Sequence, residues 1–273
     1  MRILVSFKVT PDFEALREAD WAAAAADGVR TRYARRILNC FDESALELAL
    51  RLSEALADQG GAADLSALSV GGRETEPYLK TLQALGYGRA ARVEPEAALD
   101  FAPAVTAALV ASYVQQVDHS DLLLLGCRSG PGDSGTMPFR VAENLGWPCP
   151  TQVVEMAPLA DERVRVACMV DDGLLRATVR LPCVLAVGNA VVSRLRVPTL
   201  TDRLAQRGKP IAVLSAADLG VDIAEELSRE TCALTGLEAI ERARPGVIVH
   251  GETPRAKAQA LFAEHLKTRM EKL

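Results

Sequence analysis

The stretch that decides the fold is residues 121–137, which reads DLLLLGCRSGPGDSGTM. Its first part, Asp121–Leu125, is a short apolar run typical of a buried strand. Its second part, Gly126–Met137, contains four glycines, which let backbone N–H groups approach a ligand closely, and the hydroxyls of Ser134 and Thr136. A helix is expected to begin at Thr136, so its N-terminal amides and dipole would point at the loop. The stretch therefore has the features of a phosphate-binding loop at the carboxyl end of a strand.

The same loop lacks the residues that nucleotide hydrolysis requires. It matches neither GxxxxGK[ST] nor GxGxxG, and it has no lysine for a γ-phosphate, so an NTPase is disfavoured. On the residues alone, two interpretations stay open: a nucleotide-phosphate loop and a plain glycine-rich turn without a ligand.

Around the loop, the first 150 or so residues alternate between strand-like and helix-like segments. This order predicts an α/β fold with a doubly wound, mainly parallel sheet. The expected strands are Arg2–Lys8, Leu65–Val70, Ala91–Val93 and Asp121–Leu125, and the expected helices start at Asp42, Thr75, Phe101 and Thr136.

The rest of the chain has a different character. Short turns separate the strand-like pieces Thr151–Met156, Arg163–Val170, Leu174–Val179 and Val184–Val187, which predicts an antiparallel hairpin that leads into a last core strand. From Lys209 onward the chain is mixed and polar, apart from a short apolar piece and an amphipathic helix over Thr253–Lys272. We therefore expect a nucleotide-binding α/β domain over residues 1–208 and an extended C-terminal arm over residues 209–273. Because the arm has no core of its own, it must fold back on the domain or dock on a partner.

Composition disfavours several classes of protein. The net charge is −5 and no basic stripe stands out, which argues against nucleic-acid binding. The longest apolar runs are too short to span a bilayer. The six cysteines have no CxxC spacing, and neither an HExxH motif nor a nucleophile elbow is present, which disfavours metal and hydrolytic chemistry. Reduced thiols and an N-terminus that enters a strand directly predict a cytoplasmic protein.

Two further segments carry candidate binding residues. Asn39 precedes a helix that Asp42 can N-cap, so the Asn39 amide could reach a ligand over the sheet edge, although a capping motif without a ligand is the simpler interpretation. Leu200 lies in the linker Pro198–Asp202 and is expected to be exposed, which for a single leucine requires no function.

In this order, these segments resemble the beta subunit of electron transfer flavoproteins over roughly residues 1–225. The matching motifs are the helix start Asn39–Glu47, the glycine loop with Asp133-Ser134, the Asp-x-Gly-x(7)-Leu-Pro-x-Val segment Asp171–Val184, Thr199-Leu200 followed by Lys209–Ile211, and Asp218–Asp222.

The resemblance implies a heterodimer in which a larger alpha subunit holds most of the redox FAD. The beta subunit of such proteins is a shallow cradle with a nucleotide of its own, which is AMP in ordinary members and a second FAD in electron-bifurcating members. The arm would wrap the alpha subunit. A dehydrogenase would donate electrons and a redox partner would accept them.

Site residues follow from the same resemblance, position by position. The aromatic residue beside the flavin ring falls on Phe13, and the residues that dock the dehydrogenase fall on Thr199, Leu200 and Thr201. The nucleotide contacts fall on Ser6, Asn39, Cys40, Phe41, Asp42, Val70, Gly126, Cys127, Arg128, Ser129, Gly130, Pro131, Gly132, Asp133, Ser134, Gly135, Thr136 and Met137.

The chain departs from the family pattern at a few of these positions. The run Arg128–Pro131 replaces the usual Gln-Ala/Ser-Ile-Asp, Thr136 replaces a glutamine, and Pro138 replaces a glycine. A carboxylate, an amide and an N–H are thereby lost from the expected ligand shell. Thr201 replaces a proline, and Met169 stands where many members have a glutamate.

The leading hypothesis is therefore an electron-carrier subunit without catalytic residues of its own. The alternative is a nucleotide-binding regulatory module of similar α/β topology, which explains the loop and the helix start but not Asp171–Val184 or Thr199-Leu200. A free-standing enzyme is a third reading, and no catalytic pair in the sequence favours it.

Overall fold

The computed structural model describes residues 1–22, 31, 33–95, 99, 101–130, 135–229 and 246–271. The chain divides into two compact units, Met1–Leu237 and Glu238–Leu273. Among the described residues, no helix combines the length and the apolar character needed to cross a membrane.

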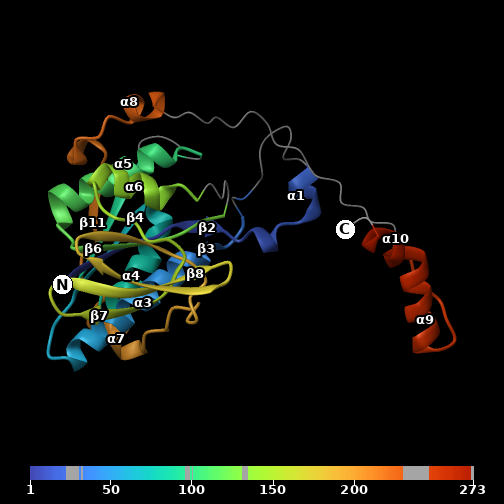
Figure 1. Cartoon of the computed structure of the whole chain (residues 1–273). Helices are drawn as coiled ribbons and strands as arrows, with labels where there is room; N and C mark the ends of the chain where they lie inside the picture. The colour runs from blue at the N-terminus through green and yellow to red at the C-terminus, as the bar shows by residue number, and fades with distance from the viewer. Residues whose placement is uncertain are drawn as a thin grey trace. The chain divides into compact units, whose positions relative to one another are not determined.

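The first unit is built on a nine-stranded sheet with the strand order β11-β5-β4-β1-β6-β10-β7-β8-β9 (Figure 1). Every pair from β11 to β7 is parallel, whereas β7 with β8 and β8 with β9 are antiparallel. This confirms the predicted fold class, a mainly parallel α/β sheet that ends in antiparallel strands. The strands are β1 (Arg2–Ser6), β4 (Asp64–Val70), β5 (Arg89–Glu94), β6 (Leu122–Gly126), β7 (Val153–Leu159), β8 (Arg163–Val170), β9 (Gly173–Arg180), β10 (Cys183–Val187) and β11 (Ala212–Ser215).

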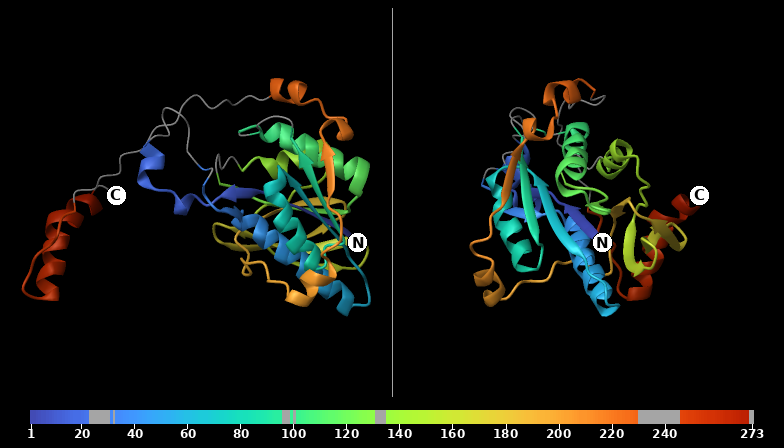
Figure 2. Two further views of the ribbon diagram at one scale, coloured as in Figure 1. Left: turned by 180° about the vertical axis from the view of Figure 1, so that it is seen from behind. Right: turned by 90° about the vertical axis from the view of Figure 1, so that its left-hand side faces the viewer.

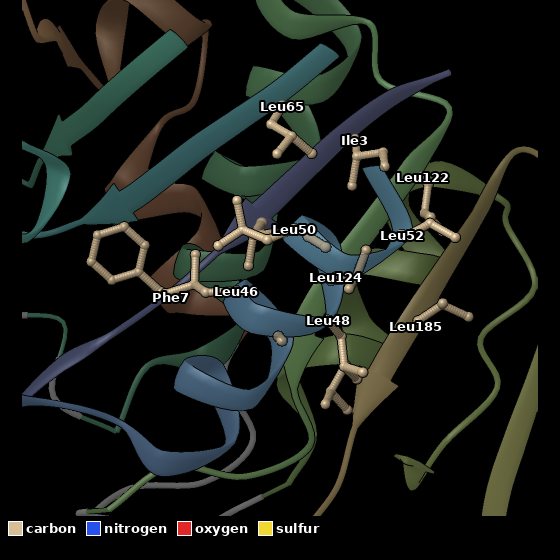
Figure 3. Close-up of a cluster of buried hydrophobic side chains, with 14 of the residues drawn as sticks. Ile3, Phe7, Leu46, Leu48, Leu50, Leu52, Leu65, Leu122, Leu124 and Leu185 are labelled. Atoms are coloured by element: carbon tan, nitrogen blue, oxygen red, sulfur yellow. The ribbon is translucent and has the colours of Figure 1, made fainter. Parts of the chain in front are cut away.

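Helices cover both faces of the parallel strands (Figure 2). The helices α3 (Cys40–Asp58) and α4 (Glu76–Ala84) pack on one face, and α5 (Pro103–Tyr113) and α6 (Met137–Leu145) pack on the other. Because successive side chains of a strand point to opposite faces, the leucines of β6 divide between the two cores. Leu122 and Leu124 join the α3 side, which Figure 3 shows, and Leu123 and Leu125 join the α5 side.

Helix α3 starts two residues earlier than its sequence suggests. Asn39 occupies the N-cap position in an extended conformation, with φ of −61° and ψ of 132°. The prediction that Asp42 caps this helix was therefore wrong, since Asp42 lies inside the first turn and bonds to the ends of strands. The inner side of α3 is apolar, and its residues Ala45, Leu46, Ala49, Leu50 and Leu52 are buried.

The antiparallel strands form a meander, β7–β9, that extends past the end of β10. β7 runs parallel to β10, but the two strands pair only where Val153 meets Val187, the last residue of β10. Nearly all of β7 therefore continues beyond the end of β10, and β8 and β9 follow it. A second, two-stranded sheet joins β2 (Val9–Pro11) to β3 (Arg36–Leu38) and was not predicted, because three-residue strands leave no periodic signal.

The segment after β10 carries the short helix α7 (Leu200–Ala205), and it returns to the sheet as β11, an edge strand beside β5. Helix α8 (Ile223–Ser228) follows and packs near α5. In the second unit, α9 (Pro254–Leu261), a π-helical turn (Phe262–Leu266) and α10 (Lys267–Met270) lie within the predicted terminal helix. None of the residues described between 246 and 271 is buried.

Candidate functional site

Three parallel strands end at one edge of the sheet and create the candidate site. β1 ends at Ser6, β4 at Val70 and β6 at Gly126, and β1 pairs in parallel with both neighbours. The carboxyl edge of an open α/β sheet is the usual place for a ligand crevice. The structure thus brings together three of the predicted nucleotide contacts that are far apart in the sequence.

Asp42 ties the ends of two of these strands together. Its Oδ2 accepts a hydrogen bond from the Lys8 backbone N–H, just after β1, at 2.8 Å. Its Oδ1 accepts one from the Gly126 backbone N–H, at the end of β6, at 2.7 Å. A carboxylate in the first turn of α3 therefore satisfies two backbone donors that the parallel ladder does not use.

This carboxyl group is buried, and its ionisation is costly. Burial raises the pKa of Asp42 to about 6, although hydrogen bonds from the Lys8 amide, the Asn39 side chain and the Gly126 amide act in the opposite direction. Asp42 is thus a structural acceptor held inside the loop, rather than a solvent-facing acid.

Gly126 is required at its position by close packing. A Cβ there would lie 2.5 Å from Asp42 Oδ1, 2.8 Å from the Phe41 Cβ and 2.9 Å from the Asp42 nitrogen. These distances are shorter than van der Waals contacts allow, so the first loop glycine is needed for the approach of α3 to β6.

The following loop residues are held from the same helix start. Asn39 is buried, and its Nδ2 donates to the Arg128 backbone oxygen at 2.7 Å. Gly135 has a φ of 62°, in the left-handed region that favours glycine. α6 then begins at Met137, directly after Thr136, but Pro138 in its first turn carries no N–H. The predicted contacts Pro131, Gly132, Asp133 and Ser134 lie outside the described residues.

The remaining predicted contacts lie at the same edge of the sheet and differ in how far they are buried. Cys127 is buried and its N–H donates to Val187 of β10 at 2.8 Å, whereas Cys40 is exposed. Phe13 lies beside the loop, since a Cβ on Gly130 would meet its ring at 3.8 Å. Its ring centroid is 5.9 Å from that of Trp21.

A cavity of about 340 Å³ opens between the loop and the meander. Its residues come from the start of α3, from the ends of β6 and β10, and from β8 and the start of β7, so the sheet order and the packing of α3 bring them together. No sequence pattern pointed to Gln152, Val154 or Asn189 as site residues. The available signal was the position of Asn189 two residues after a buried strand, at the edge where ligands bind. The lining residues are Phe41, Cys127, Arg128, Gln152, Val154, Met169 and Asn189.

The predicted docking residues form a separate feature. Thr199 caps α7: its side-chain oxygen accepts from the Asp202 N–H at 3.2 Å, while Asp202 Oδ2 accepts from the Thr199 N–H at 2.9 Å. Leu200 and Thr201 follow in the first turn and are exposed, as predicted for Leu200. α7 contacts α4, which packs on the opposite face of the sheet from α6, the helix that follows the glycine loop (Figures 1 and 2).

Comparison with known proteins shows the family to which the chain belongs. Residues 28–219 match the family model described as "Electron transfer flavoprotein domain". The chain is 34% identical over 273 residues to an Escherichia coli (strain K12) protein called "Putative electron transfer flavoprotein subunit YgcR", a match that covers 99% of this chain and all of that protein.

Proteins named "Electron transfer flavoprotein subunit beta" match nearly as widely. The one from Bacillus subtilis (strain 168) is 28% identical over 268 residues, 96% of each chain. The one from Bos taurus is 29% identical over 231 residues, 84% of this chain and 86% of its own. The chain therefore belongs to the electron transfer flavoprotein beta subunit family.

Proposed function

We propose that this beta subunit pairs with an alpha subunit, and that the heterodimer accepts electrons from a dehydrogenase and passes them to a redox partner. FAD, held mainly by the alpha subunit, supplies the redox chemistry when bound. This chain would position the flavin and shield it from water, and it would act as an electron-carrier subunit without catalytic residues of its own. Because the described cysteines are free thiols, we expect the carrier to work in the cytoplasm.

The loop Gly126–Met137 is the observation that carries the nucleotide part of the proposal. It leaves the carboxyl edge of a parallel sheet and runs into the N-terminus of the nine-residue helix α6. Arg128 is exposed on it and would supply positive charge for a phosphate. These features fit AMP, or a second FAD if the heterodimer bifurcates electrons.

The roles of the individual contacts can be separated. Asn39 and Asp42 already bond to the backbone of Arg128, Lys8 and Gly126. We therefore propose that these two side chains shape the loop, while Ser6, Val70 and the loop itself line the nucleotide. The other proposed contacts are Cys40, Phe41 and Met137, and Phe13 is proposed to lie beside the flavin ring.

The alpha subunit would cover surfaces that this chain leaves bare. In the second unit, Leu261, Phe262, Leu266 and Met270 are large apolar side chains exposed to solvent. Exposed apolar groups of this kind mark interaction surfaces. We propose that residues 209–273 act as the arm, starting at the edge strand β11, and that residues 1–208 act as the cradle.

The docking of the dehydrogenase would use Thr199, Leu200 and Thr201. The leucine side chain is 72% exposed, and the capping box at Thr199 orders the turn that carries it. An ordered, exposed apolar side chain is suited to insertion into a pocket on a partner.

The test is to co-express the chain with its alpha subunit, purify the heterodimer, and separate the flavin and adenine nucleotide released on denaturation. We expect one FAD and one AMP per heterodimer, or two FAD. Arg128→Ala should lower the bound AMP and retain the alpha-subunit FAD, and Arg51→Ala on the exposed side of α3 should change neither. One flavin without adenine nucleotide would overturn the nucleotide role, and failure to bind any alpha subunit would overturn the heterodimer.

A further inference from the structure

The segment of residues 195–210, called the docking segment here, carries an exposed helix with little support of its own. α7 has six residues and no buried side chain. A helix of that length is not stable in isolation, because nucleation costs more than one turn recovers. The helix must therefore be held from outside, and the contacts that hold it come from α3 and α4.

At the start of the docking segment, two carboxylates of α3 accept backbone hydrogen bonds. Glu43 Oε1 accepts from the Leu195 N–H at 3.1 Å, and Glu47 Oε2 accepts from the Arg196 N–H at 3.1 Å. The two acceptors are one helical turn apart and lie on one side of α3. They fix two successive residues of the docking segment against the helix.

The Arg196 side chain adds a clamp across Glu47 and one further carboxylate, Glu54. Its guanidinium bonds to Glu47, with Nη2 to Oε1 at 2.7 Å and Nε to Oε2 at 3.1 Å, and it also bonds to Glu54. The side chain of Glu47 is only 4% exposed and that of Arg196 is 39% exposed, so the carboxylate end of this pair is shielded from water. Burial raises the pKa of Glu47, but the hydrogen bonds from Arg196 and Arg51 and the charge of Arg196 together outweigh that effect and hold this pKa below its ordinary value.

The far end of the docking segment is held by α4. Gln83 Nε2 donates to the Pro210 oxygen at 2.7 Å, and Lys80 Nζ donates to the Lys209 oxygen. The docking segment is therefore fixed at both ends, at Arg196 and at Lys209-Pro210, and α7 lies between these two points.

The two fixed ends of the docking segment determine where the side chains of Leu200 and Leu204 lie. These leucines are one helical turn apart, and both are well exposed, at 72% and 59%. Their position relative to the rest of the subunit depends on the two ends of the docking segment. Arg196 is four residues before Leu200 and makes more bonds to the body of the protein than any other docking-segment residue described above.

We propose that Arg196 is a positioning residue for partner docking: its clamp on Glu47 and Glu54 holds α7 so that Leu200 and Leu204 face the partner in one orientation. The proposal rests on the proposed function for its partner, a dehydrogenase with an apolar pocket, but the clamp itself can be tested without one.

Arg51 provides a matched control. Its Nε lies 3.2 Å from Glu47 Oε1, so it pairs with the same carboxylate as Arg196. It does so from within α3, four residues along the same helix. Removing Arg51 therefore removes one ion-pair partner of Glu47 but none of the bonds between Glu47 and the docking segment.

The first measurement is amide hydrogen exchange in the heterodimer. We expect Arg196→Ala to speed exchange over residues 199–206 about tenfold, equivalent to about 1.4 kcal/mol of local opening free energy, while the amides of β6 stay protected. Arg196→Lys should restore part of the protection, and Arg51→Ala should leave it unchanged. Should Arg196→Ala fail to fold, Glu54→Gln removes only the exposed half of the clamp. Unchanged exchange in α7 would overturn the clamp.

The second measurement uses a dehydrogenase that reduces the wild-type heterodimer. Arg196→Ala should raise the KM for the heterodimer several-fold with little change in kcat, in the same direction as Leu200→Ala. If Leu200→Ala raises KM but Arg196→Ala loosens α7 without raising KM, the positioning role is wrong. If Leu200→Ala itself has no effect on KM, the proposed docking function fails, while the exchange data still decide the clamp.

Discussion

Strands β6 and β9 both carry adjacent leucines, but those of β6 are buried and those of β9 are exposed. In β6, Leu122–Leu125 are all buried between helices on both faces of the sheet. In β9, Leu174 and Leu175 are well exposed, the latter at 57%. β6 pairs with β1 and β10 in the middle of the sheet, whereas β9 is the last strand of the meander. The same residue type therefore has different roles, set by strand order.

The difference shows what each part of the sheet is for. Central parallel strands are covered on both faces and read as continuous apolar runs, so their leucines stabilise the fold. The exposed apolar residues of the meander, Met169 and Val170 in β8 with Leu174 and Leu175 in β9, contribute little to the core of this chain. Their side chains divide between the two faces of the meander, because Met169 pairs with Leu174 and successive residues of a strand point to opposite faces. Exposed apolar side chains of this kind are typical of interaction surfaces, which agrees with the proposed heterodimer.

The largest expected effect is on the free energy of unfolding, when a buried leucine of β6 and an exposed leucine of β9 are each replaced by alanine. Leu124→Ala should lower the free energy of unfolding by about 2–5 kcal/mol, because it leaves a cavity in a fully buried core. Leu175→Ala should change it by less than about 0.5 kcal/mol, since the side chain already contacts water. Urea denaturation of the free chain measures both values. A larger loss for Leu175→Ala than for Leu124→Ala would break the comparison.

The sequence predicted this contrast only in part. β6 and the meander strands were expected at nearly their observed positions, because apolar runs and turn residues mark them locally. The exposure of Leu174 and Leu175 could not be predicted, since it depends on which strands and helices become neighbours. The cavity residues Gln152 and Asn189 were missed for the same reason: they meet only through the strand order.

The same limit explains the error at Asp42. Local capping rules place an aspartate before a helix, and the sequence offers no sign that two strand ends compete for this carboxylate. In the structure, the Lys8 and Gly126 amides come from segments 34 and 84 residues away and occupy both of its oxygens. Asn39 was predicted at the site and lies there, but its amide bonds to the loop backbone.

Asp42 adds a buried carboxyl group at the carboxyl edge of the central strands, a feature that the exposed meander lacks among its described residues. Its pKa rises from an ordinary 3.8 to about 6 in the folded chain. Between those values the folded chain binds more protons than the unfolded chain, so the free energy of unfolding falls as pH rises from about 4 to about 6. At about 1.4 kcal/mol per pKa unit, this group accounts for a loss of about 3 kcal/mol, complete above that range.

Asp42→Asn tests this expectation directly. The variant should lose the pH-dependent contribution between about pH 4 and 6, so its stability relative to the wild type improves as pH rises through that range. It should still be less stable near neutral pH, by about 1–3 kcal/mol, because an amide can accept only one of the two N–H groups. Asp58→Asn, at the exposed end of α3, is the control and should follow the wild-type curve. Parallel curves for the wild type and Asp42→Asn would show that Asp42 does not titrate there.

The smallest expected effect compares two glycines of the loop Gly126–Met137: Gly126, which packs against α3, and Gly130, which does not. Gly126→Ala places a Cβ 2.5 Å from Asp42 Oδ1 and 2.9 Å from the Asp42 nitrogen, so α3 must move away from β6. We expect a loss of about 1–3 kcal/mol in the free energy of unfolding, as for other overpacked sites, together with weaker nucleotide binding. Gly130→Ala is the matched control, because among the described residues its new Cβ would meet the Phe13 ring alone, at an ordinary 3.8 Å. Equal losses for the two variants would mean that the close approach of α3 to β6 does not set the shape of this loop, and that the glycines act through backbone freedom alone.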